Sequence, residues 1–262
     1  MYEIQTYLGA DGLMHCTVCK EPVEAFYPKG SLLEMRKHHR QCACERKAYA
    51  EEAQYYKEKE HRELIARNKK ICFEEKEMEG FTFQNVERDS GVIRIAEEYV
   101  TNWQKMKQNH MGYLFWGPVG TGKSYLATCI ANALLEKEVT VKMTNFNTIL
   151  NDLFAAEDKT EYIRLLNGYE LLIIDDLGVE RSSEYALENI FSVIDWRYRS
   201  GKPLIITTNL PLAQLKQETK IEKKRIYDRI LERCIPVKID GVSRREAMAN
   251  DNMQTMKNIL KI

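Results

Sequence analysis

An octapeptide at residues 117–124, GPVGTGKS, limits the folds open to this chain, because it fits the pattern G-x-x-x-x-G-K-[ST]. An apolar run at 113–116 comes directly before it, and a run of helix formers at 123–135 comes after it. A strand, a glycine-rich loop and a helix in this order form a phosphate-binding loop, in which backbone N–H groups and the helix N-terminus face the phosphates. The octapeptide therefore predicts an α/β fold that binds ATP or GTP.

Individual residues of this loop have predicted roles. Lys123 would reach the β- and γ-phosphates, and the Ser124 hydroxyl would ligate magnesium. The glycines allow consecutive N–H groups to turn inward around the phosphates. The candidates for nucleotide contact are the eight loop residues and the next one: Gly117, Pro118, Val119, Gly120, Thr121, Gly122, Lys123, Ser124 and Tyr125.

Short apolar runs alternate with amphipathic runs over the rest of the C-terminal part of the chain, which predicts a parallel sheet with helices on both faces. We expect five strands, at 113–116, 139–143, 171–175, 204–208 and 235–239. We expect helices between them, at 123–135, 146–156, 160–167, 183–198 and 222–233. Five strands are enough for a doubly wound nucleotide-binding domain.

Polar residues follow two of these strands. The run LLIIDD ends in Asp175 and Asp176, at the carboxyl edge of the sheet where nucleotides bind. We expect Asp175 to hold magnesium through water and Asp176 to orient or deprotonate the attacking water. Asn209 follows the strand at 204–208 and is a candidate sensor of the γ-phosphate or the lytic water. The alternative for Asn209 is an ordinary turn residue.

Arginines recur every four residues in the run KKRIYDRILER, so Arg225, Arg229 and Arg233 share one helix face. Such a row either pairs with neighbouring acids, points at a partner's phosphates, or is a solvated face. The segment 216–245, which ends in Arg244 and Arg245, is locally basic although the whole chain has 39 basic and 39 acidic residues. A local basic surface suits contacts with a nucleic-acid backbone or with the nucleotide.

The N-terminal part carries two cysteine pairs, Cys16 with Cys19 and Cys42 with Cys44. Four thiolates at this spacing are suited to one structural zinc ion. A short segment that lacks a large core needs the stabilisation that such a metal ion provides. Ordinary unligated cysteines are the alternative. Three histidines stand beside the pairs and could replace one cysteine as a ligand: His15, His38 and His39.

A charged stretch at 45–80 follows the second cysteine pair, is free of proline and predicts a long exposed helix. It favours a spacer over a partner-binding face. We therefore expect two domains, a front domain with the cysteines and the charged helix at 1–78 and a nucleotide-binding domain at 79–262. The sequence shows neither a signal peptide nor an apolar run long enough for a membrane span, so we expect a cytoplasmic protein with no membrane partner.

Taken in order, the segments GPVGTGKSYLA, LLIIDDLG, PLIITTNL, RIYDRILERC and GVSRRE resemble the AAA+ ATPases of the DnaC/DnaI helicase-loader group. The transposition ATPase IstB is a close relative of that group. The resemblance covers about residues 81–245, and the cysteine pairs followed by a charged helix are similar to the zinc-bearing front domain of some loaders. It implies an ATPase that uses ATP, Mg²⁺ and Zn²⁺ in DNA replication.

The resemblance also implies roles for single residues. Lys123, Ser124, Asp175 and Asp176 would form the ATPase site, and Asn209 would be sensor 1. Within the segment RIYDR, Arg229 would be the arginine finger and Arg225 the competing candidate, and Arg245 would take the sensor 2 position.

The resemblance implies a mechanism in which ATP binding and hydrolysis act as a switch. ATP would lie between self-assembled subunits, a neighbour's arginine would reach the γ-phosphate, and the nucleotide would control the grip on single-stranded DNA. The front domain would hold the replicative helicase. Two other functions remain open, an IstB-like transposition helper and a P-loop kinase, and the kinase has no reason to keep Asn209 or Arg229.

Overall fold

The computed structural model describes residues 5–33, 36–85, 91–179, 183–241 and 243–260. Its internal contacts divide the chain into two compact units, Met1–Leu64 and Ile65–Ile262. The division falls within one long helix, α1 (Ala43–Cys72), which supplies residues to both units. The proposed functional boundary after residue 78, which keeps this helix with the cysteines, stays a prediction.

The first unit consists of two small hairpins and the beginning of α1. Strand β1 (Thr6–Leu8) pairs antiparallel with β2 (Met14–Cys16), and β3 (Glu24–Phe26) pairs antiparallel with β4 (Lys37–His39). Its buried cluster contains two cysteines and one valine, Cys16, Cys42 and Val23. A unit with so few buried apolar side chains needs another source of stability.

Helix α1 starts beside the cysteine pairs and ends in the second unit. The Glu21 carboxylate accepts a hydrogen bond from the Ala43 backbone N–H at 2.7 Å and so caps the first turn. The helix ends at Cys72, which is buried with Phe73 in the core of the second unit, and a short 3₁₀ turn, η1 (Lys76–Gly80), follows. The helix expected over 45–80 is therefore wrong beyond residue 72, because burial of this apolar pair turns the chain.

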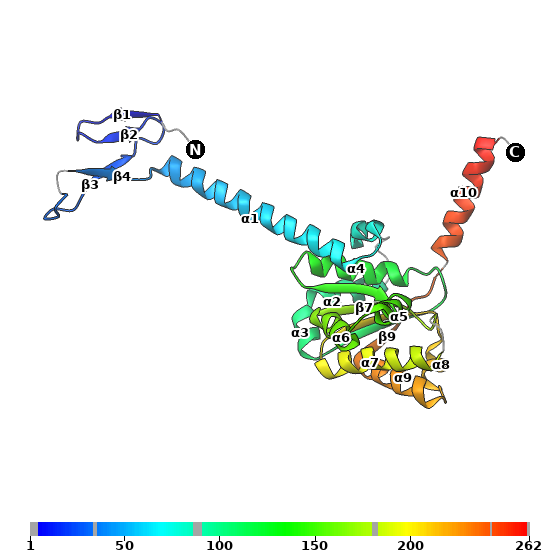
Figure 1. The fold of residues 1–262 in the computed structure, drawn as a ribbon. Helices are drawn as coiled ribbons and strands as arrows, with labels where there is room; N and C mark the ends of the chain where they lie inside the picture. Colours follow the sequence, from blue (N-terminus) through cyan, green and yellow to red (C-terminus); the bar gives the residue numbers. More distant parts are fainter. Residues whose placement is uncertain (1–4, 34–35, 86–90, 180–182, 242, 261–262) are drawn as a thin grey trace. The chain divides into compact units, whose positions relative to one another are not determined.

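The second unit, which Figure 1 shows with its sheet and helices, is built on a parallel sheet of five strands. Their order is β6-β7-β8-β5-β9. The strands are β5 (Gly112–Trp116), β6 (Val141–Asn145), β7 (Leu171–Leu177), β8 (Leu204–Thr208) and β9 (Cys234–Lys238). Strand β8 lies between the strand before the phosphate loop and the strand that carries the two aspartates. This order confirms the predicted fold class and brings the polar ends of three neighbouring strands together.

Helices cover both faces of this sheet. One apolar cluster joins the sheet to α2 (Gly91–Thr101), α3 (Trp103–Gln108) and α4 (Lys123–Leu135). A second cluster joins the opposite face to α5 (Phe146–Ala155), α6 (Lys159–Gly168), α7 (Glu184–Ser200), α8 (Leu212–Lys216) and α9 (Ile221–Arg233). The sequence predicted five of these helices to within about two residues, but it missed α2, α3 and α8.

Two further elements were not predicted. A one-turn 3₁₀ segment, η2 (Phe83–Asn85), precedes α2, and a helix after the sheet, α10 (Arg244–Leu260), follows β9. Strand β6 begins and ends two residues later than expected. Among the described residues, no helix has both the length and the apolar character needed to cross a lipid bilayer.

Candidate nucleotide site and metal centre

The glycine-rich loop joins β5 to α4 with a backbone that L-residues rarely adopt. Gly117, Gly120 and Gly122 have φ values of 143°, 81° and 92°. A Cβ atom at Gly117 would lie 2.2 Å from the carbonyl oxygen of Ile239, and one at Gly120 would lie 2.2 Å from the Ser243 hydroxyl. The loop therefore needs glycine at these positions, both for its conformation and for its close contact with the segment after β9.

Lys123 starts α4, and its ammonium group folds back under the loop. Its Nζ donates to the carbonyl oxygens of Gly117 at 3.0 Å and Pro118 at 2.7 Å. The residue is only 5 % exposed. The positive charge is thus held at the base of the loop, and its contact with the phosphates stays a prediction.

The two aspartates end β7 beside β8 and differ in environment. Asp175 is half-buried, whereas Asp176 is exposed and has a left-handed backbone with φ 55°. Thr207 of β8 connects them, because its hydroxyl donates to Asp175 Oδ1 at 2.5 Å and accepts from the Asp176 N–H at 2.9 Å. Thr207 is not among the site residues predicted from the sequence, although the polar TTN triplet at the end of a buried strand was a signal for it.

Asn209 follows Thr207 by two residues and faces the second aspartate. Its Nδ2 lies 3.5 Å from Asp176 Oδ1, at the limit of a hydrogen bond. The predicted sensor and the predicted water-orienting acid are therefore neighbours in this structure.

The surroundings of Asp175 fit a hard cation. Burial raises the pKa of this carboxyl above its ordinary value, and hydrogen bonds from Thr207 and Ser124 partly oppose that rise. A nearby cation stabilises the charged form of a buried carboxylate, and Mg²⁺ prefers oxygen ligands such as a carboxylate and a hydroxyl. Ser124 and Asp175 are thus the residues that would hold magnesium.

The predicted finger residue already has a partner. Arg229 on α9 donates through Nε and Nη2 to Asp195 Oδ1 on α7, at 2.8 and 2.7 Å. Its guanidinium also lies over the rings of Phe191 and Tyr198, at 4.6 and 5.7 Å. The side chains of Arg229 and Asp195 are only 24 % and 11 % exposed, so α7 holds this arginine in one orientation.

The other arginines of the row are held differently. Arg225 is exposed and stacks on Phe191 at 4.3 Å, and Arg233 stacks on Tyr198 at 4.5 Å. The backbone of Arg245 lies in the first turn of α10, and its side chain is outside the described part of the structure. Ser243, two residues earlier, contacts Gly120 of the loop, so the chain enters α10 from the phosphate-loop side.

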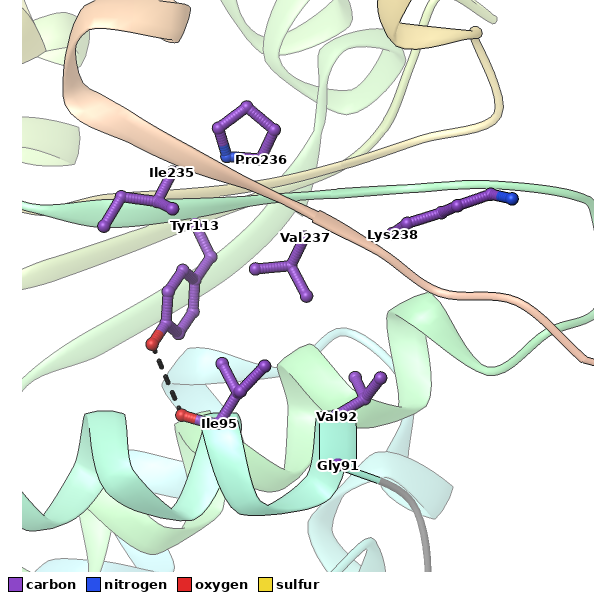
Figure 2. A pocket seen from close by; sticks show the side chains of 8 residues that line it. All are labelled: Gly91, Val92, Ile95, Tyr113, Ile235, Pro236, Val237 and Lys238. Carbon is purple, nitrogen blue, oxygen red and sulfur yellow. Dashed lines mark hydrogen bonds between the residues drawn. The ribbon is translucent and has the colours of Figure 1, made fainter.

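A groove of about 630 Å³ lies between α2 and the edge strand β9 (Figure 2). Apolar side chains of Val92, Ile95, Ile235 and Val237 line most of it, and the Tyr113 hydroxyl donates to the Ile95 carbonyl at 3.3 Å. None of its lining residues belongs to the predicted phosphate or magnesium site. The groove is therefore separate from the chemistry described above.

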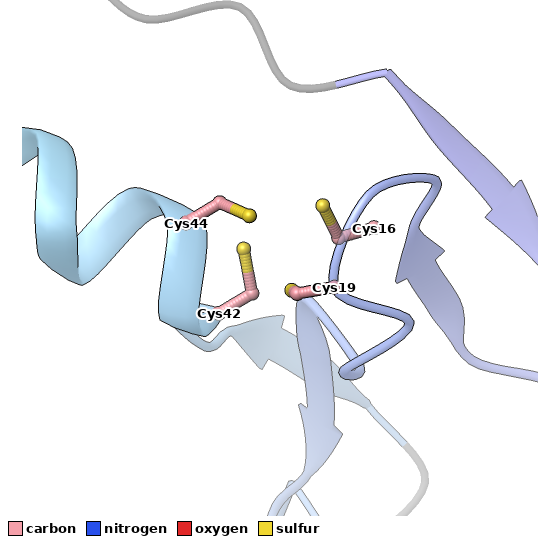
Figure 3. A group of neighbouring side chains, drawn as sticks. All are labelled: Cys16, Cys19, Cys42 and Cys44. Carbon is pink, nitrogen blue, oxygen red and sulfur yellow. The ribbon is translucent and has the colours of Figure 1, made fainter.

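The four N-terminal cysteines converge on one point (Figure 3). Their sulfur atoms all lie within 4.8 Å of one another. A tetrahedral zinc site with Zn–S bonds of about 2.3 Å has sulfur–sulfur edges of about 3.8 Å, so the four thiols fit that geometry. A turn closed by the Lys20 N–H to Cys16 carbonyl bond at 3.0 Å presents the first pair, and the start of α1 presents the second.

The thiols differ in acidity. A hydrogen bond from the Glu21 backbone, followed by one from the Cys44 backbone, lowers the pKa of the Cys19 thiol to about 6. Removal from water raises the pKa of the Cys44 thiol to about 11. In the described part of the chain, the group of side chains that could hold a metal consists of these cysteines and includes no histidine. The rings of His15 and His39 contact Asp11 and Glu45 instead, both at 3.0 Å.

Comparison with known proteins gives consistent matches. The model of the family described as IstB-like ATP binding protein matches residues 48–251. The replicative helicase loader DnaC of Escherichia coli K12 is 28 % identical over 149 residues, which cover 55 % of this chain and 58 % of that protein. The replicative helicase loader DnaI of Bacillus subtilis is 23 % identical over 192 residues, which cover 67 % of this chain and 62 % of that protein.

A crystal structure of DnaI has the same fold, with a TM-score of 0.58 and 24 % identity. The match covers 68 % of this chain and 99 % of that structure. This chain therefore spans only about three fifths of the length of the two curated relatives, and the likeness to the solved structure shows the fold alone.

Proposed function

Because this chain belongs to the IstB-like ATP binding protein family, we propose that it is an ATP-dependent loader of a replicative helicase. The observation that carries this choice is the four-cysteine cluster, which belongs to a compact unit of its own and would give the chain a second surface for a partner. The names of the E. coli and B. subtilis relatives support it. We place its action in the cytoplasm, in DNA replication.

The nucleotide unit would hydrolyse ATP as a switch. The loop N–H groups and Lys123 bind the β- and γ-phosphates, and Ser124 and Asp175 hold Mg²⁺. Mg²⁺ held by these residues would neutralise part of the negative charge of the phosphates. Asp176, supported by the Asn209 amide, orients the attacking water. Arg229 of a neighbouring copy completes the site, so turnover requires self-assembly.

The four-cysteine unit would bind one structural Zn²⁺ through Cys16, Cys19, Cys42 and Cys44. With so small an apolar core, this unit derives its folding free energy from the metal. The metal has four protein ligands and no open position, so its role is to hold the surface that contacts the helicase.

We expect one zinc per chain in protein purified without chelator, measured by elemental analysis. The double variant Cys16→Ser, Cys19→Ser should lose the zinc and the fold of the first unit, while nucleotide binding persists in the second unit. The matched control is Cys129→Ser, which removes a buried thiol outside the cluster and should keep the zinc. Zinc-free wild-type protein, or a double variant with unchanged metal content, contradicts this assignment.

Binding to single-stranded DNA should be independent of sequence and should fall steeply as salt rises, because phosphate contacts by the basic segment 216–245 dominate it. A non-hydrolysable ATP analogue should strengthen it. Fluorescence anisotropy with labelled oligonucleotides of two unrelated sequences, at several salt concentrations, measures both effects. Tight, salt-resistant binding to one duplex sequence would favour the alternative function, an IstB-like transposition helper. The description of the matched family also supports that alternative.

Helicase loading itself is tested with full-length protein and the purified replicative helicase of the same source. The two should form a complex by size-exclusion chromatography, and the double cysteine variant should lose the complex while it retains ATP binding. If both proteins remain separate with and without ATP analogue and DNA, the loader function is wrong.

A further inference from the structure

The hydroxyl of Thr207 makes contact with both predicted catalytic acids at once. It donates its one proton to Asp175 Oδ1 at 2.5 Å, and a lone pair accepts the Asp176 N–H at 2.9 Å. Thr207 is fully buried in the middle strand of the site. Water therefore has no access to replace this hydroxyl in either hydrogen bond.

These two bonds have different consequences for the two acids. The bond to Asp175 fixes one carboxylate oxygen and so fixes the rotamer that directs the other oxygen. The bond from the Asp176 N–H holds a non-glycine residue at φ 55°, a left-handed backbone conformation that such residues rarely adopt. That backbone turn directs the Asp176 side chain out of the sheet and toward Asn209.

We propose that Thr207 is the positioning residue of this site: its single hydroxyl sets the magnesium acid and the water-orienting acid in their relative positions. This inference rests on the proposed ATPase function of the second unit. Thr207 would act through its hydrogen bonds to Asp175 and Asp176.

The next residue offers a matched control. Thr208 is also a fully buried threonine of β8, and its hydroxyl likewise donates and accepts one hydrogen bond. Its partners are the Leu177 carbonyl at 2.7 Å and the Leu210 N–H at 3.0 Å, and neither belongs to the site. Thr207→Val and Thr208→Val therefore remove equivalent hydroxyls at equal burial, and only the first of them contacts the acids.

The experiment compares full-length wild type with Thr207→Val, Thr207→Ser and Thr208→Val. Binding of a fluorescent ATP analogue is titrated against Mg²⁺, turnover is measured at saturating Mg²⁺, and thermal unfolding is followed without nucleotide. In Thr207→Val the Mg²⁺ concentration for half-maximal binding should rise and turnover should fall, each by about 10–100-fold, the usual effect of losing a partner of a metal ligand. Binding of the analogue without Mg²⁺ should not change.

Thr207→Ser keeps the hydroxyl and should restore both values nearly to those of wild type. Thr208→Val should lose as much thermal stability as Thr207→Val but keep the wild-type Mg²⁺ requirement. If Thr207→Val unfolds, Thr207→Ser and Thr207→Ala are compared by the same titration, and equal Mg²⁺ requirements overturn the inference.

When Thr207→Val folds, three results overturn the inference: an unchanged Mg²⁺ requirement in Thr207→Val, a defect in Thr207→Ser as large as in Thr207→Val, or an equal defect in Thr208→Val. Failure of the ATPase function would look different, because wild type itself would then bind the analogue without regard to Mg²⁺.

Discussion

Replacing Lys123 by alanine should abolish ATP hydrolysis and weaken nucleotide binding. The ammonium group lies at the base of the loop, in contact with the Gly117 and Pro118 carbonyls, where it would meet the β- and γ-phosphates. Removing one charged donor from developing negative charge costs on the order of 10²–10³ in turnover, and here the same group also supports ground-state binding. Phosphate release and binding of a fluorescent ATP analogue measure the two losses.

Asp176→Asn is the matched control for this result. Asp176 lies on the exposed side of the site and would contact the attacking water rather than the phosphates, so binding should persist while turnover is lost. Equal loss of binding in Lys123→Ala and Asp176→Asn would mean that Asp176 is a second metal ligand or a structural acid.

Arg229→Ala should bind ATP normally and hydrolyse it poorly. An arginine supplied by a neighbouring subunit typically contributes about 10³–10⁵ to turnover in P-loop enzymes. Arg225→Ala serves as the comparison, because Arg225 shares the helix face but stacks on Phe191 and is exposed. ATP turnover in the presence of DNA or of the partner helicase measures the effect.

A mixing experiment tests whether the arginine acts between subunits. Lys123→Ala protein has a defective nucleotide site and an intact finger, and Arg229→Ala protein has the reverse. Their mixture should recover part of the lost activity under conditions in which wild type assembles. If the mixture with Arg229→Ala stays inactive while a mixture of Lys123→Ala with Arg225→Ala recovers activity, Arg225 is the finger. Failure of both mixtures would leave both arginines a role within their own subunit.

The sequence predicted the sheet and the phosphate loop because these features depend on local patterns. Strand β8 and helix α4 have the expected bounds, since a run of buried β-branched residues and a helix that starts at the loop lysine are both unambiguous. The four-cysteine cluster could also be predicted from the sequence, because the spacing of metal ligands is a local pattern.

The remaining features depend on contacts between distant residues. The hydrogen bonds between Thr207 and the two aspartates join residues 31 and 32 positions apart, and the Arg229–Asp195 pair joins residues 34 positions apart. Such contacts follow from strand order and helix packing, which no single segment encodes. The end of α1 at Cys72 has the same origin, because a charged helical pattern does not reveal where a neighbouring core will bury two residues.

The pairing of Arg229 with Asp195 also bears on the energetics of subunit association. A guanidinium that is 24 % exposed has already lost much of its hydration, so a neighbour's γ-phosphate would replace a carboxylate and not a shell of water. When the Arg229 guanidinium moves from Asp195 to the phosphate, one anionic partner replaces another, and the number of charge-assisted hydrogen bonds would change little. The free energy of association would then include only the difference in free energy between two ion pairs. This difference would vanish when the terminal phosphate leaves. So small a free energy of association would make subunit assembly readily reversible within one hydrolytic cycle.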